Sequence, residues 1–392
     1  MAGKAPGPAI VPPILVTAST AAVIPGGPAA WTARISDLQG RLGRPGVRDE
    51  DLRRDIAVLY TYRGNEAASR GDLDQAASDY QSATGSDPAL TVPLVNLGRL
   101  RLVEGKDDEA ESVLRDALSQ HPDDPAALRL LGEVDYRRGD LDEAIDAWTR
   151  SLQSRPDPEL ETRLLKAHKE RSIEKGYLRT DGAHFTLKYD GERASDALSG
   201  EILDHLEQVY EDLTVKFDAF PPSVIVVTLY SREAFEDVTD SPRWVGGLFD
   251  GQIRVPIGGL TRLTQAARGV FTHELTHCIV FYKTHGNSPR WLQEGIAQWA
   301  EGKSARGMRR SLAQEFSGAT PADARARFSY PQSLSMLESF IDTWGFPQLL
   351  DLLDRLGGGS DFDTAFEETT GTGFDRFVDS WLVSLNAPGG ID

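Results

Sequence analysis

A strict period of 34 residues governs one stretch of the chain and limits what that stretch can fold into. Glycine recurs at positions 64, 98 and 132, and again at 71, 105 and 139. Alanine keeps the same interval at 76, 110 and 144, and proline keeps it at 88, 122 and 156. A unit of this length cannot bury its apolar face alone, so neighbouring units must stack on one another.

Each unit has the pattern of two helices joined by a turn. Small residues at the first glycine and at the alanine allow close helix packing, the second glycine ends the first helix, and the proline begins the next unit. Strings such as RGDLDQAASDYQSA and RGDLDEAIDAWTRS resemble tetratricopeptide (TPR) repeats. The resemblance implies an all-α TPR solenoid over residues 51–175, with three repeats and a capping helix near residues 159–174.

A stacked solenoid of this kind presents a concave groove. Such grooves usually bind peptide segments or partner proteins, which predicts a protein partner or protein substrate for this region. A rigid spacer that orients the next domain is the alternative, and the sequence does not separate the two interpretations.

The second strong feature is the pentapeptide HELTH at residues 273–277. On a helix, His273 and His277 lie on one face about one turn apart, so both imidazoles can reach one metal ion. Glu274 projects beside them, where a carboxylate can act as a general base without being a ligand. This spacing is typical of a zinc site.

Two side chains hold zinc weakly, so a third ligand is expected, with one position left open. Glu294 follows His277 by 17 residues and lies near the start of a second helical segment, residues 291–301. A turn at residues 286–289 would make the two helices antiparallel and bring Glu294 back to the histidines.

These segments resemble the gluzincin metallopeptidases and, within them, the bacterial peptidase MA-like domains. The resemblance rests on HELTH, on PRWLQEGIA and on AEG. A metzincin would instead need glycine at position 280 and histidine at position 283, where this chain has Val280 and Lys283.

The resemblance implies an α+β, zincin-like metallopeptidase domain over residues 176–388, so the whole chain is predicted to be multidomain. It also implies one Zn2+ per chain, held by His273, His277 and Glu294, with Glu274 as the catalytic base. The chain shows no GxMEN segment of the kind that binds a free amino terminus, which favours an endopeptidase over an aminopeptidase.

The oxyanion donor and the residue that orients the first histidine are less defined. Tyr330 is the catalytic candidate for the donor, by resemblance to the tyrosine of aminopeptidase-type gluzincins, and His285 and Arg290 compete with it. Thermolysin-like gluzincins place an aspartate one turn after the ligand glutamate, where this chain has Gln298. Either the Gln298 amide or Glu301 is expected to orient the histidine.

After the repeats, the apolar pattern changes to a period of two, which indicates strands. Strands are predicted at residues 184–189, 223–230 and 252–257, with a helix over residues 195–217. Pro256 cannot donate to a ladder, so the third strand is predicted to lie at the edge of the sheet. The resemblance implies that this edge pairs with an extended substrate.

Residues 1–50 are predicted to be a flexible leader rich in proline, glycine and alanine. The apolar stretch at residues 9–24 also permits a secretory signal, but it is too short for a transmembrane segment. The compartment of this soluble protein therefore stays open between cytoplasm and export. A net charge of −18 argues against nucleic acid and anionic membranes as partners. The only cysteine, Cys278, is predicted to be a buried core thiol.

Three functions are consistent with these features. The first is a zinc-dependent endopeptidase whose TPR groove selects or positions protein substrates. The second is a TPR adaptor with an inactive or very slow metallopeptidase-like domain, although neither Glu274 nor a ligand is missing. The third is a metal-dependent hydrolase that acts on a non-peptide amide.

Overall fold

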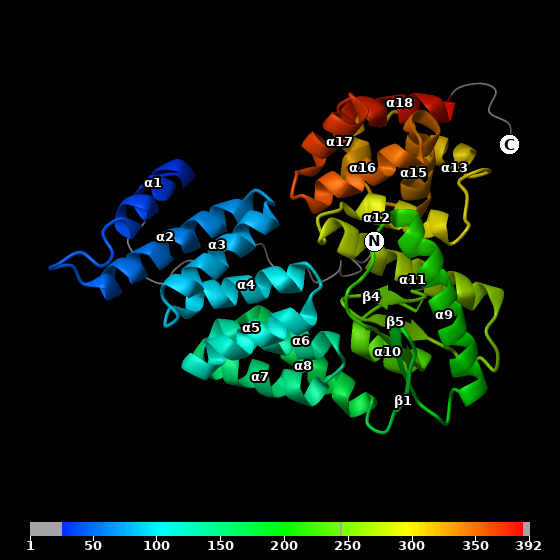
Figure 1. Cartoon of the computed structure of the whole chain (residues 1–392). Helices are drawn as coiled ribbons and strands as arrows, with labels where there is room; N and C mark the ends of the chain where they lie inside the picture. The colour runs from blue at the N-terminus through cyan, green and yellow to red at the C-terminus, as the bar shows by residue number, and fades with distance from the viewer. Residues whose placement is uncertain (1–25, 244, 387–392) are drawn as a thin grey trace. The chain divides into compact units, whose positions relative to one another are not determined.

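A computed structural model of the chain describes residues 26–243 and 245–386 (Figure 1). Contacts within the chain divide it into two compact units, with the division after Lys175. The apolar stretch at residues 9–24, with its predicted leader or signal, lies outside the described residues. Among the helices that are described, none is both long and apolar enough to cross a membrane.

Helices are the only regular elements of the first unit between residues 28 and 173, and from residue 51 onward the repeat pattern predicts them. Helices α2 to α7 pack as three consecutive pairs, and α8 packs on α7. The helices are α1 (Pro28–Gln39), α2 (Asp49–Ser69), α3 (Leu73–Ser86), α4 (Thr91–Val103), α5 (Asp107–Gln120), α6 (Pro125–Arg137), α7 (Leu141–Ser154) and α8 (Pro158–Ile173).

The repeated glycines act as the sequence predicts. A Cβ atom at the first glycine of a repeat would lie less than 3 Å from a buried side chain of the second helix. The colliding pairs are Gly64 with Tyr80, Gly98 with Leu114, and Gly132 with Trp148. The second glycines, at positions 71, 105 and 139, have φ angles of 77°, 76° and 76°, a left-handed conformation that ends each first helix.

Helix α1 departs from the predicted flexible leader, because it occupies residues 28–39. Trp31, Ile35 and Leu38 follow helical spacing and are buried in a cluster shared with α2. The helix therefore has an apolar face of its own, and α2 covers it.

The second unit, from Gly176, combines a five-stranded sheet with helices. The strand order is β1-β2-β3-β5-β4; β2, β3 and β5 are parallel, whereas β1 and β4 run antiparallel to their neighbours. The strands are β1 (Leu178–Asp181), β2 (Phe185–Tyr189), β3 (Ile225–Tyr230), β4 (Leu248–Phe249) and β5 (Ile253–Pro256). The helices are α9 (Asp196–Phe217), α10 (Arg232–Thr239), α11 (Gln265–Thr284), α12 (Arg290–Ala300), α13 (Arg309–Glu315), α14 (Pro321–Ala326), α15 (Tyr330–Trp344), α16 (Phe346–Gly357), α17 (Phe362–Thr370) and α18 (Phe374–Asn386).

The three predicted strands are present, but the predicted edge position of the third is wrong. Strand β5 lies between β3 and β4, and the two-residue β4 forms the edge. Leu248 and Phe249 of β4 pair with Arg254 and Ile253 of β5. Pro256 lies beyond the end of β4, so its missing N–H group interrupts no hydrogen bond to that strand.

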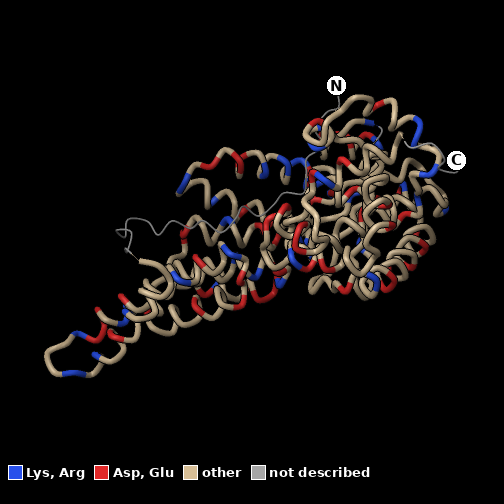
Figure 2. Tube along the Cα trace, turned by 90° about the horizontal axis from the view of Figure 1, so that it is seen from above, with Lys and Arg blue, Asp and Glu red and all other residues tan. Residues whose placement is uncertain are grey.

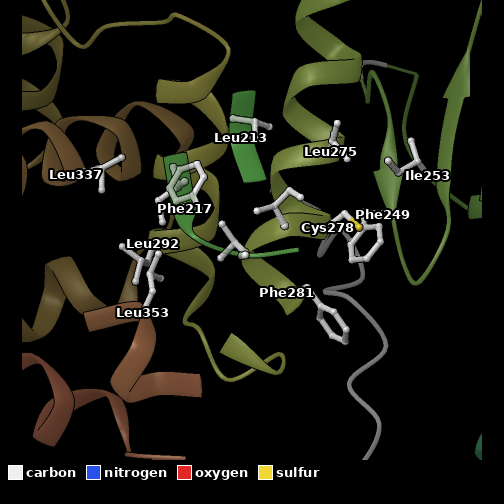
Figure 3. Close-up of a cluster of buried hydrophobic side chains, with 14 of the residues drawn as sticks. Leu213, Phe217, Phe249, Ile253, Leu275, Cys278, Phe281, Leu292, Leu337 and Leu353 are labelled. Atoms are coloured by element: carbon white, nitrogen blue, oxygen red, sulfur yellow. The ribbon is translucent and has the colours of Figure 1, made fainter. Parts of the chain in front are cut away.

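One apolar core joins the sheet to the helices around it, and α11 runs through this core. Helix α11 packs against α9, α12, β4 and β5. Figure 3 shows Phe249 and Ile253 of the sheet beside Leu275 and Phe281 of α11. Cys278 is fully buried in the same core and forms no disulfide, which confirms the predicted core thiol. The core thereby fixes the helix that carries HELTH.

Charged residues are interspersed along both units, with Asp and Glu close to Lys and Arg (Figure 2). In the first unit many of them form ion pairs between helices. Arg129 lies 2.6 Å from Asp157, and Arg63 lies 2.6 Å from Asp79. The first pair joins α6 to the start of α8, and the second joins α2 to α3.

Candidate metal centre

Helix α11 positions the first two predicted ligands. The Thr264 hydroxyl caps the helix by accepting the backbone N–H of the third residue after it, at 3.2 Å. Leu275 and Ile279 bury one side of the helix. His273 and His277 lie on another side and are partly buried, with ring centroids 4.8 Å apart and Nε2 atoms 3.2 Å apart.

Helix α12 brings Glu294 to the two histidines. After α11, Gly286 takes a left-handed φ of 75°, which reverses the chain before α12 begins. The Oε2 atom of Glu294 then lies 3.5 Å from Nε2 of His273 and 3.6 Å from Nε2 of His277. The structure thus brings together the three residues that the sequence nominated as metal ligands.

The spacing of these three atoms suits a tetrahedral metal ion. Ligand atoms about 2.0–2.1 Å from such an ion are separated from one another by about 3.3–3.4 Å. The buried Oε2 atom of Glu294 has no hydrogen-bond partner among the described residues, and an unsatisfied carboxylate oxygen is costly. Two imidazoles and a carboxylate are also a known donor set of catalytic zinc sites. The residues therefore fit Zn2+.

The pKa values of Glu294 and His273 are both shifted in the direction that favours the charged form of each side chain. Burial acts to raise the pKa of Glu294, but His273 and His277 outweigh it and lower that pKa. Burial acts to lower the pKa of His273, but Glu294 and Glu301 outweigh it and raise that pKa to about 10. Several carboxylates thus surround two imidazoles, an arrangement that favours a bound cation.

Glu274, the predicted base, lies next to the three candidate ligands without joining them. Its side chain is buried, with 5% of the residue exposed. Burial raises its pKa, and the two histidines oppose that effect. A buried carboxylate beside the ligands is placed to exchange a proton with a group bound at the centre.

Of the two residues that the sequence left open for orienting His273, Glu301 is the one that lies next to its ring. Its Oε2 atom lies 3.3 Å from Nδ1 of His273 and 2.8 Å from Nζ of Lys303. The Gln298 amide instead donates to the backbone oxygens of Glu294 and Tyr330, each at 3.0 Å. Lys303 was not predicted from the sequence, because nothing in its local pattern indicates that it contacts Glu301.

The three candidate oxyanion donors occupy different places. Tyr330 is half-buried at the start of α15; burial and then Glu294 raise its pKa, whereas a contact with Arg290 opposes them. Arg290 lies 4.0 Å from Oε1 of Glu294. His285 is directed elsewhere, because its Nδ1 atom lies 2.8 Å from the backbone oxygen of Gly357. Tyr330 and Arg290 are thus the two candidates near the centre.

Models of two protein families match this region and the repeats. Residues 221–387 match the model of the Peptidase MA superfamily, and residues 95–159 match a tetratricopeptide repeat model. No curated protein sequence matches the chain.

Solved structures resemble the helical part of the chain only loosely. The first TPR of Spaghetti (RPAP3) bound to an HSP90 peptide shares 23% identity, over 30% of this chain and 93% of that one, with a TM-score of 0.29. A thermophilic TPR protein from Thermus thermophilus shares 22% identity, over 36% of this chain and 74% of that one, with a TM-score of 0.25. From the two family models, the chain carries a Peptidase MA superfamily region preceded by tetratricopeptide repeats.

Proposed function

We propose that this chain is a zinc-dependent metallopeptidase that cleaves within unfolded protein segments. His273, His277 and Glu294 hold the ion, and Glu274 is the general base. The main support is the convergence of two Nε2 atoms and one buried carboxylate oxygen at mutual distances of 3.2, 3.5 and 3.6 Å. The Peptidase MA superfamily match over residues 221–387 supports the same reaction class.

Each side chain of the centre has one task in this proposal. When bound, zinc supplies a Lewis acid that polarises the scissile carbonyl and makes water a better nucleophile at neutral pH. Glu274 accepts the proton of the attacking water on its carboxylate and returns it to the leaving nitrogen. Glu301 fixes the ring orientation of His273 through Nδ1, 3.3 Å away.

Tyr330 donates a hydrogen bond to the oxygen that becomes negative in the transition state. Its hydroxyl is near Glu294, and Arg290 helps to hold it. Loss of one such donor typically costs about 100-fold or more in kcat. We therefore expect Tyr330→Phe to lower kcat with little change in KM. If Arg290→Gln lowers kcat while Tyr330→Phe does not, Arg290 takes this role instead.

The reaction is tested by comparing wild-type chain, Glu274→Gln and Glu192→Gln on a reduced, unfolded protein. Glu192 is exposed in the same unit and serves as the matched control. We expect wild type and Glu192→Gln to produce the same new peptide termini, and Glu274→Gln to be slower by about 100-fold or more at unchanged zinc content.

An adaptor is the second candidate function, and one feature of the first unit favours it. Asn65, Arg99 and Glu133 are spaced 34 residues apart, so these three different side chains occupy equivalent positions on α2, α4 and α6. The buried Nε atom of Arg99 has no hydrogen-bond partner among the described residues. Burial and then the neighbouring Arg129 lower the pKa of Arg99. An acidic peptide would supply the missing partner.

The peptidase and adaptor functions predict different results in the same proteolysis experiment. If the wild-type chain binds one zinc ion but cleaves no more than Glu274→Gln, the adaptor function is favoured and the peptidase proposal is contradicted. Peptide selection from a random library with wild type and Arg99→Gln then tests the adaptor, which predicts enrichment of acidic residues only for wild type.

A further inference from the structure

Gly247 lies directly against the carboxyl group of Glu274. A Cβ atom added at Gly247 would lie 2.6 Å from Cγ, 2.9 Å from Cδ and 2.7 Å from Oε1 of Glu274. Carbon and oxygen atoms that are not bonded do not approach so closely. The residue at 247 and the carboxyl of Glu274 therefore share one space, and only glycine leaves that space to the carboxyl.

The backbone conformation at this position does not itself require glycine. Gly247 is absent from the residues with positive φ, whereas its near neighbour Gly251 has a φ of 103°. Alanine at residue 247 therefore meets no left-handed backbone strain. The requirement for glycine comes from the space that Glu274 occupies.

The chain around Gly247 is held in place on both sides. Before it, the backbone oxygen of Val245 accepts a hydrogen bond of 2.7 Å from Nη1 of Arg232. After it, the next two residues pair with β5, and the ring of Phe249 lies 5.7 Å from that of Phe281 on α11. The segment cannot easily move away from α11 to accept a side chain.

The turn that follows β4 is anchored as well. Arg254 of β5 is fully buried and forms an ion pair with Asp250. The backbone N–H of Asp250 donates to the oxygen of Gln252 at 3.2 Å. Of the two groups that would collide, the strand is therefore fixed, and the Glu274 side chain is the one that can rotate away.

Other close glycines of the same unit differ in what they face. A Cβ atom at Gly295 would lie 2.7 Å from the backbone oxygen of Ser333, and one at Gly357 would lie 2.4 Å from the backbone oxygen of Lys283. Such collisions push helices apart and affect the fold. At Gly247 the obstacle is a single side chain, from Cγ to the carboxyl of Glu274, and no backbone atom, so the fold can tolerate the change while the carboxyl cannot keep its place.

We propose that Gly247 is a positioning residue: by lacking a side chain, it allows the edge segment before β4 to pass beside Glu274 and keeps the carboxyl of Glu274 directed at the metal centre. This inference rests on the proposed function, in which Glu274 is the general base. It predicts that alanine at position 247 displaces the base without removing the metal ligands.

The test compares Gly247→Ala with Gly182→Ala. Gly182 provides a matched control, because a Cβ atom there would also meet a glutamate carboxyl, 2.6 Å from Oε1 of Glu207. Gly182 precedes β2, and the sheet separates β2 from the β4 edge by β3 and β5. Both variants add a methyl group against a glutamate carboxyl, one at the centre and one away from it. At Gly182 the Cβ atom would also lie 2.9 Å from Cδ1 of Leu203.

We expect Gly247→Ala to bind one zinc ion, to melt within a few degrees of wild type, and to lose about 10- to 100-fold in kcat with little change in KM, as for a catalytic group displaced by about 1 Å. Gly182→Ala should keep wild-type kcat. The proposal is overturned if Gly247→Ala keeps wild-type kcat, or if it loses zinc and stability in proportion to activity.

A double-mutant cycle separates positioning from a general weakening of the site. If Gly247 acts through Glu274, adding Gly247→Ala to Glu274→Gln should cause no further loss of kcat. Fully additive losses would contradict the proposal, because they would show that Gly247 acts on something other than the base.

A crystal structure of Gly247→Ala tests the inference without any activity. We expect the Glu274 carboxyl to be rotated away while β4 and the two histidines stay in place. An unchanged Glu274 beside a displaced β4 would overturn the inference. If the wild-type chain cleaves nothing, the proposed function fails, and this structure still decides whether Gly247 positions Glu274.

Discussion

The two units use glycine in contrasting ways. In the TPR unit, Gly64, Gly98 and Gly132 leave room for large buried side chains, and the same contact occurs three times. In the second unit, Gly247 leaves room for the carboxyl of Glu274, and a Cβ at Gly269 would lie 3.0 Å from Oε1 of Glu301. Glycine maintains helix packing in both units, but only in the second do Gly247 and Gly269 also make room for carboxylates of the candidate metal centre.

This difference predicts which substitutions should change stability and which should change metal binding or reaction rate. A repeated packing contact contributes to the stability of its own repeat and its neighbours, so its loss should be seen in unfolding. A contact made once, at a candidate metal centre, should be seen in metal binding or in rate. The following predictions test whether stability and chemistry separate between the units in this way.

The largest expected effect on stability is that of Trp148→Ala. Trp148 is fully buried, fills the space left by Gly132 and donates a hydrogen bond of 3.0 Å to the backbone oxygen of Arg129. Truncation of such a residue should lower the free energy of unfolding of the TPR unit by about 3–5 kcal/mol. Denaturant unfolding followed by circular dichroism measures this loss. A parallel loss of zinc binding would contradict the separation of stability and chemistry between the units, because the second unit should keep its metal.

Asp135 should make the stability of the TPR unit depend on pH. Burial and then Glu111 raise its pKa from 3.8 to about 7. Between about pH 4 and pH 7 the unfolded chain has lost this proton and the folded chain keeps it, so stability falls as the pH rises, by up to about 1.4 kcal/mol per pH unit.

Asp135→Asn removes this titration and should melt at a higher temperature than wild type above pH 7 but not near pH 4. Thermal unfolding of both chains at several pH values checks the prediction. A wild-type advantage at pH 8 would show that the charged carboxylate is stabilising and that its pKa is not raised.

The smallest of these effects is expected for Glu301→Gln. An amide in place of the carboxylate still reaches Nδ1 of His273 but holds the ring less firmly and lowers its basicity. Zinc affinity should fall by about 10- to 100-fold, or about 1.4–2.7 kcal/mol. Competition with a chelating dye measures this. Gln298→Ala should change zinc affinity less, since Gln298 contacts backbone oxygens; the reverse order would reassign the orienting residue.

The fold was predictable wherever a pattern recurs along the sequence. The 34-residue period predicts the helix pairs, alternation predicts β2, and a continuous apolar run predicts β3, because each pattern reflects how its element is buried. The place of β5 in the sheet was not predictable in this way. Pro256 shows only that one backbone N–H group is missing. Strand order depends instead on which segments of the chain pair in three dimensions.

In the candidate site, too, the sequence predicts what nearby residues determine but not what contacts between distant segments determine. HELTH places two imidazoles on one helix face, and a short turn limits where Glu294 can lie, so the sequence could nominate all three. The choice of Glu301 over Gln298 depends on the rotation of α12 about its axis. The contact of Gly247 with Glu274 depends on how β4 packs on α11, for which the sequence shows no periodic signal.

We propose that His273, His277 and Glu294 hold one zinc ion, and anomalous X-ray diffraction at the zinc absorption edge locates such an ion without reference to activity. We expect one strong peak about 2.0–2.2 Å from Nε2 of both histidines and from Oε2 of Glu294 in crystals of the zinc-loaded chain. Crystals that show no peak there, or a peak held by other side chains, would contradict it.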